Sequence, residues 1–181
     1  MESTSKSYLK EAEKCKTLFL AKARDYGTSW RVLRLTSLTD QMYIKASRIR
    51  SIEQKGVNKV GDDIQDEYVA LVNYGIMALI QLELGEACEE ELSMDQVKML
   101  YEKYLKATYD LMLVKNHDYG EAWREMRISS ITDLILMKLL RIRSIEDNKG
   151  VTEVSEGLDA NYMDIINYAF FVLIRLTEET N

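Results

Sequence analysis

Residues that interrupt helices or build covalent and metal centres are scarce in this chain of 181 residues, which has no proline, two cysteines and one histidine. Proline breaks the interior of a helix, so its absence leaves long stretches free to be helical. Two cysteines, Cys15 and Cys88, are too few for a disulfide framework or a Cys-based metal site. The scarcity therefore excludes a disulfide-stabilised fold and favours a helical one.

Long apolar runs and an excess of basic residues are also absent. No apolar run approaches the roughly 18 to 20 residues of a membrane-spanning helix, and the opening MESTSKSYLKEAEKCK lacks the apolar core of a signal peptide. We therefore expect a soluble, cytoplasmic protein without a membrane partner. The formal net charge of −6 argues against a generic nucleic-acid coat, because backbone binding depends on clustered Lys and Arg. A local basic pocket can still hold a small anion.

Apolar residues make up 46% of the sequence, which is ample for a globular core. Long stretches place these residues at the helical period. Together with the absence of proline, this periodicity predicts an all-α protein.

The chain contains an internal repeat. KARDYGTSW at 22–30 returns as KNHDYGEAW at 115–123. Between residues 25–53 and 118–146, 16 of 29 positions are identical, whereas chance gives about two, and such self-similarity marks a repeated structural unit. A one-residue slip in the following loop moves the offset from 93 to 94. The pattern indicates a duplicated and fused unit.

Each repeat is predicted to contain three helical segments. The first ends at the glycine of DYG, since glycine accepts the left-handed conformation that ends many helices. In the second repeat, SMDQ at 93–96 reads as the capping box that starts this segment. The middle segments begin near Ser37 and Ser130 and end before KGV. The last segments carry an apolar stripe with the spacing of one buried helix face.

These segments predict two tandem three-helix repeats packed as a pseudo-twofold helical bundle. We place the first repeat at residues 1–84, a linker at 85–92 and the second repeat at 93–181. A repeat of this size buries only a modest core alone, so the two should pack together as an internal pseudo-dimer. The sequence leaves open whether this unit associates further.

Many of the residues shared by the repeats are charged. Solvated surface charges contribute only about 0 to 1 kcal/mol and can drift apart after duplication. Their persistence has two explanations, a network of ion pairs between helices or a site for an anion. The matched pairs are Asp25/Asp118, Arg31/Arg124, Arg34/Arg127, Asp40/Asp133, Lys45/Lys138, Arg48/Arg141 and Arg50/Arg143.

Acidic residues near the start of each third segment form a second candidate group. Asp62 and Asp66 lie one helical turn apart in the first repeat, and Glu156 and Asp164 lie two turns apart in the second. Carboxylates in this arrangement suit Mg²⁺, which leaves room for substrate phosphates. The alternative is that they complement the positive end of the helix dipole.

Three motifs together resemble the bacterial and phage family of nucleotide modification associated domains, whose function is unknown. They are KxxDYGxxW, S-[LI]-T-D-x4-K-x2-R-I at 37–49 and 130–142, and D/E-x3-D-x3-D-x2-N-Y at the third segment. The resemblance covers most of the chain in two copies and implies an all-α domain. More distantly, the acidic helices are similar to the all-α MazG-type nucleotide pyrophosphohydrolases, which use Mg²⁺.

These features predict a nucleotide-binding protein. In the enzyme interpretation, the protein is also a Mg-dependent nucleoside triphosphate pyrophosphohydrolase. In that interpretation Asp62, Asp66, Glu156 and Asp164 hold Mg²⁺. Phosphate is neutralised by Lys45, Arg48, Lys138 and Arg141. The base stacks on Tyr26, Trp30, Tyr119 or Trp123.

Each repeat departs from the acidic pattern at one position. Alanine stands at position 70 in the first repeat and at position 160 in the second. Either the two incomplete acidic sets complement each other in one cleft, or the site has degenerated. In the second case the chain is a non-catalytic interaction or scaffold protein, and the matched charges are packing pairs.

Overall fold

The computed structural model describes residues 2–56, 61, 63–86, 89–153 and 156–179. All regular elements in these residues are helical, which confirms the predicted all-α fold. They are α1 (Glu2–Tyr26), η1 (Ser29–Val32), α2 (Leu35–Lys55), α3 (Ile64–Leu84), α4 (Met94–Tyr119), η2 (Ala122–Glu125), α5 (Ile128–Asp147) and α6 (Leu158–Glu179). The first three α-helices form one repeat and the last three form the other.

Several helix ends follow directly from local sequence. The Ser93 side chain accepts from the Gln96 backbone N–H while the Gln96 side chain bonds back, which confirms the capping box. At the end of α1, Gly27 has φ +68° and its N–H donates to the Ala23 carbonyl, 2.9 Å away. The stop predicted at DYG is therefore correct, because glycine accepts this conformation without strain.

Other helix ends differ from the expectation. The helices α2 and α5 begin at Leu35 and Ile128, two residues before the predicted serines, because the preceding arginines are extended and serve as N-caps. The helix α5 ends at Asp147, before KGV as predicted, but its C-cap is Asn148 and not a glycine. Short 3-10 turns, η1 and η2, also follow the DYG motifs. The boundaries proposed for the two repeats and the linker stay a prediction.

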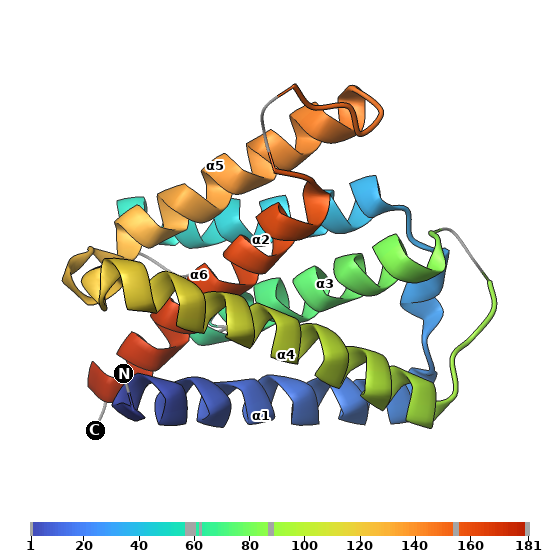
Figure 1. The fold of residues 1–181 in the computed structure, drawn as a ribbon, viewed down its shortest axis with the longest axis horizontal. Helices are drawn as coiled ribbons and strands as arrows, with labels where there is room; N and C mark the ends of the chain where they lie inside the picture. Colours follow the sequence, from blue (N-terminus) through green and yellow to red (C-terminus); the bar gives the residue numbers. More distant parts are fainter. Residues whose placement is uncertain (1, 57–60, 62, 87–88, 154–155, 180–181) are drawn as a thin grey trace.

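The helices α3 and α6 form the centre of the molecule (Figure 1). Helices α1 and α4 lie along one side of this pair, and α2 and α5 lie along the other. At the central contact, a Cβ added to Gly75 would lie 2.6 Å from Ile166 Cγ1. The absence of a side chain at Gly75 thus allows the two central helices to approach closely.

Matching hydrogen bonds show that the repeats are related by a pseudo-twofold arrangement. The Tyr8 hydroxyl donates to Asn167 Oδ1 at 2.8 Å, and its counterpart Tyr101 donates to Asn73 Oδ1, also at 2.8 Å. Each bond runs from the first helix of one repeat to the third helix of the other. The buried core is therefore shared by both repeats, as the sequence predicted.

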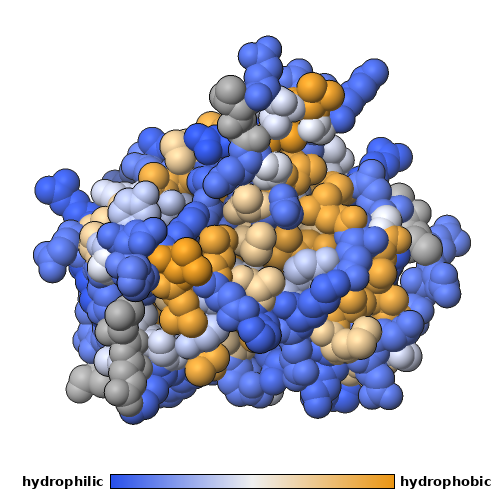
Figure 2. All heavy atoms as spheres, viewed as in Figure 1, coloured by the Kyte–Doolittle hydropathy of each residue, from blue (hydrophilic) through white to orange (hydrophobic). Residues whose placement is uncertain are grey.

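A space-filling view shows polar and charged residues over most of one face, with separate apolar patches between them (Figure 2). Among the helices that the structure describes, none is both long and apolar enough to cross a membrane.

Candidate functional site

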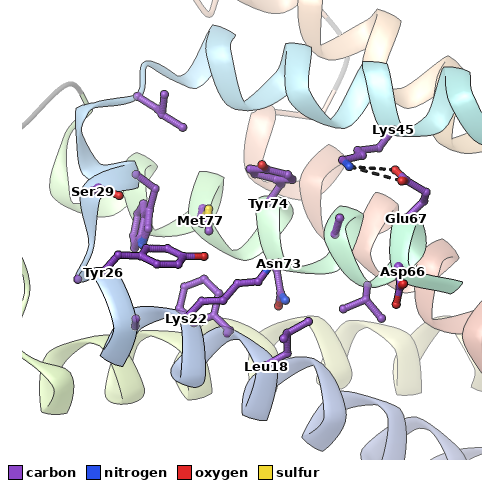
Figure 3. A pocket seen from close by; sticks show the side chains of 17 residues that line it. Leu18, Lys22, Tyr26, Ser29, Lys45, Asp66, Glu67, Asn73, Tyr74 and Met77 are labelled. Atoms are coloured by element: carbon purple, nitrogen blue, oxygen red, sulfur yellow. Dashed lines mark hydrogen bonds and ion pairs between the residues drawn. The ribbon is translucent and has the colours of Figure 1, made fainter. Parts of the chain in front are cut away.

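The first repeat contains an open pocket of about 710 Å³ between α1, η1, α2 and α3 (Figure 3). Its lining includes residues from all three motifs of the repeat: Lys22, Tyr26, Trp30, Lys45, Asp66 and Ala70. Every residue that lines it belongs to the first repeat. The motifs, which are separated along the chain, thus meet at one place.

Aromatic side chains form one end of this first-repeat pocket. Tyr26 is the last residue of α1 and is 57% exposed. The chain turns at Gly27, and the Trp30 ring on η1 packs with its centroid 6.2 Å from that of Phe19. Trp30 is buried in the core but still contributes to the pocket wall. An exposed ring beside a rigid one suits a flat ligand group.

Two lysines reach the pocket from different helices. Lys22 comes from α1 and is exposed, and Lys45 comes from α2. In the part of the chain that the structure describes, Lys22 forms no ion pair. The Asp66 carboxylate, in the first turn of α3, is likewise exposed and without an ion-pair partner among the described residues. The pocket therefore offers both a cation and a carboxylate to a ligand.

Glu67 is a central acid of this site that the sequence did not single out. Its side chain is buried, and its Oε2 lies 3.2 Å from Lys45 Nζ. Arg48 pairs with the other carboxylate oxygen, Oε1. The counterpart of Glu67 is Asn161, so comparison of the repeats hides this residue. The Glu67 carboxylate thus partly neutralises Lys45 and Arg48, which were predicted to bind phosphate.

The second repeat places an acid where the first has Ala70. This residue, Asp164, pairs through Oδ2 with Lys138 Nζ at 2.7 Å and through Oδ1 with Lys115. The Asp164 and Lys138 side chains are only 6% and 8% exposed. Burial lowers the pKa of Lys115, but the hydrogen bond that Lys115 donates to Asp164 and the nearby negative charges of Asp164 and Glu156 together outweigh this, so the pKa is raised overall. Asp164 and Lys138, predicted as a metal ligand and a phosphate ligand, bond to each other.

The aromatic residues of the second repeat are arranged differently from those of the first. The Trp123 ring stacks on Phe171 with a centroid distance of 4.3 Å and an interplanar angle of 5°. The Arg124 guanidinium lies 4.5 Å from the centre of the Trp123 ring. Tyr119 is 77% exposed, and Arg141 is also exposed. The predicted role of these residues in ligand binding stays a prediction.

Several other matched charges form ion pairs between the repeats. Arg143 Nη2 lies 2.6 Å from Asp40 Oδ1. The corresponding pair in the opposite direction joins Arg50 Nε and Asp133 Oδ1 at 3.7 Å. These contacts agree with the inter-helix network that the sequence allowed as one explanation.

The predicted acidic residues lie in different surroundings. Asp66 lines the first-repeat pocket, Asp164 is held by lysines and Glu156 is exposed. Asp62 lies outside the described residues. Within the described residues, no three His, Cys, Asp or Glu side chains are grouped so as to hold a metal ion. A single cleft holding all four acids stays a prediction.

Two Thr–Tyr–Glu groups at the repeat interface, each with a buried threonine and tyrosine and a half-buried glutamate, were also not predicted. In one, the Thr39 hydroxyl donates to Glu146 at 2.7 Å and is hydrogen bonded to the Tyr162 hydroxyl at 2.8 Å. The other, its pseudo-twofold counterpart, is formed by Thr132, Glu53 and Tyr68. Burial raises the pKa of both glutamates. The three positions carry the same residue types in both repeats, and this identity is the sequence signal from which the two groups could have been predicted.

The comparisons with known proteins give one match. A family model described as nucleotide modification associated domain 1 matches residues 22–82 and, separately, residues 115–176. The two matched segments contain the DYG turn, the middle helix and most of the third helix of each repeat. Neither the curated proteins nor the solved structures give a match.

Proposed function

Because the chain belongs to the nucleotide modification associated domain 1 family, which it contains in two copies, we propose that it binds a nucleotide in the first-repeat pocket. The observation that carries this proposal is the meeting of Tyr26, Lys22, Lys45 and Asp66 around one open cavity. Its volume of about 710 Å³ is within the roughly 300–1,000 Å³ that is usual for small-molecule sites.

The chemistry of the lining supports a ligand with a flat end and an anionic end. The exposed Tyr26 ring offers a stacking surface for a base. Lys22 and Lys45 offer ammonium groups to phosphate oxygens. Glu67 pairs with Lys45, as the close view shows (Figure 3). The base and the phosphates thus have different residues to bind.

Asp66 provides a place for Mg²⁺ that arrives with the nucleotide. Magnesium ions are commonly held by one or two carboxylates together with substrate phosphates and water. The exposed Asp66 carboxylate on the pocket wall fits this role. Among the described residues, the acids that line the pocket are Asp66 and Glu67, and Glu67 is already paired with Lys45. We therefore propose that the pocket binds the nucleotide, and a direct assay of hydrolysis tests whether it also cleaves it.

Thermal shift and equilibrium dialysis with ribo- and deoxyribonucleotides, with and without MgCl₂, test this proposal. We expect at least one nucleotide to raise the melting temperature. Lys22→Ala should weaken its affinity by about tenfold or more, because a charge-assisted hydrogen bond contributes about 1.5–3 kcal/mol. Asp66→Asn should remove the Mg²⁺-dependent part of the stabilisation.

Lys10→Ala is the matched control, because Lys10 is exposed on the same helix and does not line the pocket. Its affinity should equal that of the wild type. If no nucleotide changes the melting temperature or is retained in dialysis, the scaffold interpretation is the better one.

A further inference from the structure

The second repeat already shows how an anion is held at this position of the fold. Lys115 and Lys138 are the counterparts of Lys22 and Lys45. They come from two different helices, α4 and α5, and converge on the single carboxylate of Asp164. The carboxylate is buried and is bonded through both of its oxygens. The lysine pair therefore binds a carboxylate that belongs to the chain itself.

The first repeat keeps the lysines but lacks this internal anion. Ala70 stands at the position of Asp164, and its side chain lines the open pocket. Since the two repeats share their helix arrangement, the space above Ala70 lies where an anion can meet Lys22 and Lys45. The pocket is thus open at the point where the second repeat is closed.

We propose that Asp164 takes the place of the ligand's anionic group, so that the second repeat is an anion site closed by its own carboxylate. If Asp164 were removed, Lys115 and Lys138 would bind a carboxylate or phosphate anion from solution. The identity of the ligand in the first repeat rests on the proposed function, whereas the anion site rests on the lysine geometry. One chain then binds one nucleotide.

Two other differences between the repeats fit a closed second site. Asn161 stands in the second repeat at the position of Glu67. Lys138 therefore pairs with Asp164, whereas its counterpart Lys45 pairs with Glu67. Met77, which lines the first-repeat pocket, is replaced by Phe171, whose ring stacks on Trp123.

Chemical rescue of Asp164→Ala tests the inference. The variant leaves Lys138 buried without its carboxylate and should melt below the wild type. Acetate or inorganic phosphate, added at constant ionic strength, can replace the missing anion. For a Kd on the order of 10 mM, 100 mM anion should raise the melting temperature by about 3–6 °C. The wild type should change by less than about 1 °C under the same conditions.

Asp164→Asn is the control, because the amide fills the same space and should prevent rescue. Should Asp164→Ala fail to fold, the double variant Asp164→Ala with Asn161→Glu supplies Lys138 with an acid at the position that Glu67 occupies in the first repeat. It should fold and still be stabilised selectively by anions.

The outcomes separate this inference from the proposed function. Selective rescue supports the anion site, even when the wild type binds no nucleotide and the proposed function fails. Nucleotide binding by the wild type without selective rescue of either variant overturns the inference alone.

Discussion

Replacement of Ala70 by Asp should abolish nucleotide binding by the first-repeat pocket. The new carboxylate would stand where Asp164 stands in the second repeat, within reach of Lys22 and Lys45. It would neutralise both lysines and repel phosphate. Losing two charge-assisted hydrogen bonds, at about 1.5–3 kcal/mol each, corresponds to a loss of affinity of more than about 100-fold. Equilibrium dialysis with the nucleotide that most stabilises the wild type measures this loss.

Ala70→Asn is the matched control for this substitution. Asparagine has nearly the same size as aspartate but no charge, so it should weaken binding less. The melting temperature of Ala70→Asp without ligand should be close to that of the wild type, because Ala70 is only partly buried. Unchanged affinity in Ala70→Asp would show that no anionic group of the ligand lies above Ala70.

Gly75→Val should destabilise the whole molecule, since Gly75 lies at the contact between the two central helices. Even a Cβ at this position would lie 2.6 Å from Ile166 Cγ1. Both residues are buried, so the neighbouring side chains have little room to move. Overpacking of a core typically costs about 1–3 kcal/mol and sometimes more. We expect a loss of free energy of unfolding near the upper end, about 3 kcal/mol, measured by urea denaturation.

Ile166→Ala provides the compensating change. Alone, it should destabilise the protein by about 2–5 kcal/mol through the cavity it creates. Combined with Gly75→Val, it should cost less than the sum of the two, because the valine occupies part of the vacated space. Additive losses would mean that the two side chains do not meet at this contact.

The helices and the duplication could be predicted because their causes are local. Helical periodicity, the Ser93 capping box and the glycine at the end of α1 each act within a few residues. Comparison of the repeats then gave the pseudo-twofold packing without any tertiary information. The start of α2 was misplaced by two residues because Arg34 serves as the N-cap without a side-chain bond, and no sequence signal marks such a start.

The contents of the site were harder to predict because they depend on contacts between helices. Glu67 differs between the repeats, so a search for matched residues passed over it. Asp164 was assigned to a metal by its spacing along one helix, whereas its bonds to Lys115 and Lys138 come from two other helices. Matched residues thus singled out Lys45, Lys138 and the aromatic rings, whereas the part played by Lys22 and Lys115 was not predicted, and unmatched residues make the two sites different.

This difference between the repeats has a physical explanation. A buried lysine needs an acidic partner, because an unpaired buried charge is costly. Lys138 is such a lysine, and Asp164 is its partner at the anion position itself, whereas the half-buried Lys45 pairs with Glu67, which lines the pocket. The two repeats thus pair the lysine of the middle helix with acids that lie about one helical turn apart on the third helix.

A calorimetric titration of the wild-type protein with its best nucleotide, in the presence of Mg²⁺, tests the central claim most directly. The account predicts a stoichiometry of one nucleotide per chain, with the binding heat lost in Ala70→Asp. Two equivalents per chain would contradict the closure of the second repeat. Absence of any binding heat over a range of temperatures would contradict the assignment of the first-repeat pocket as a nucleotide site.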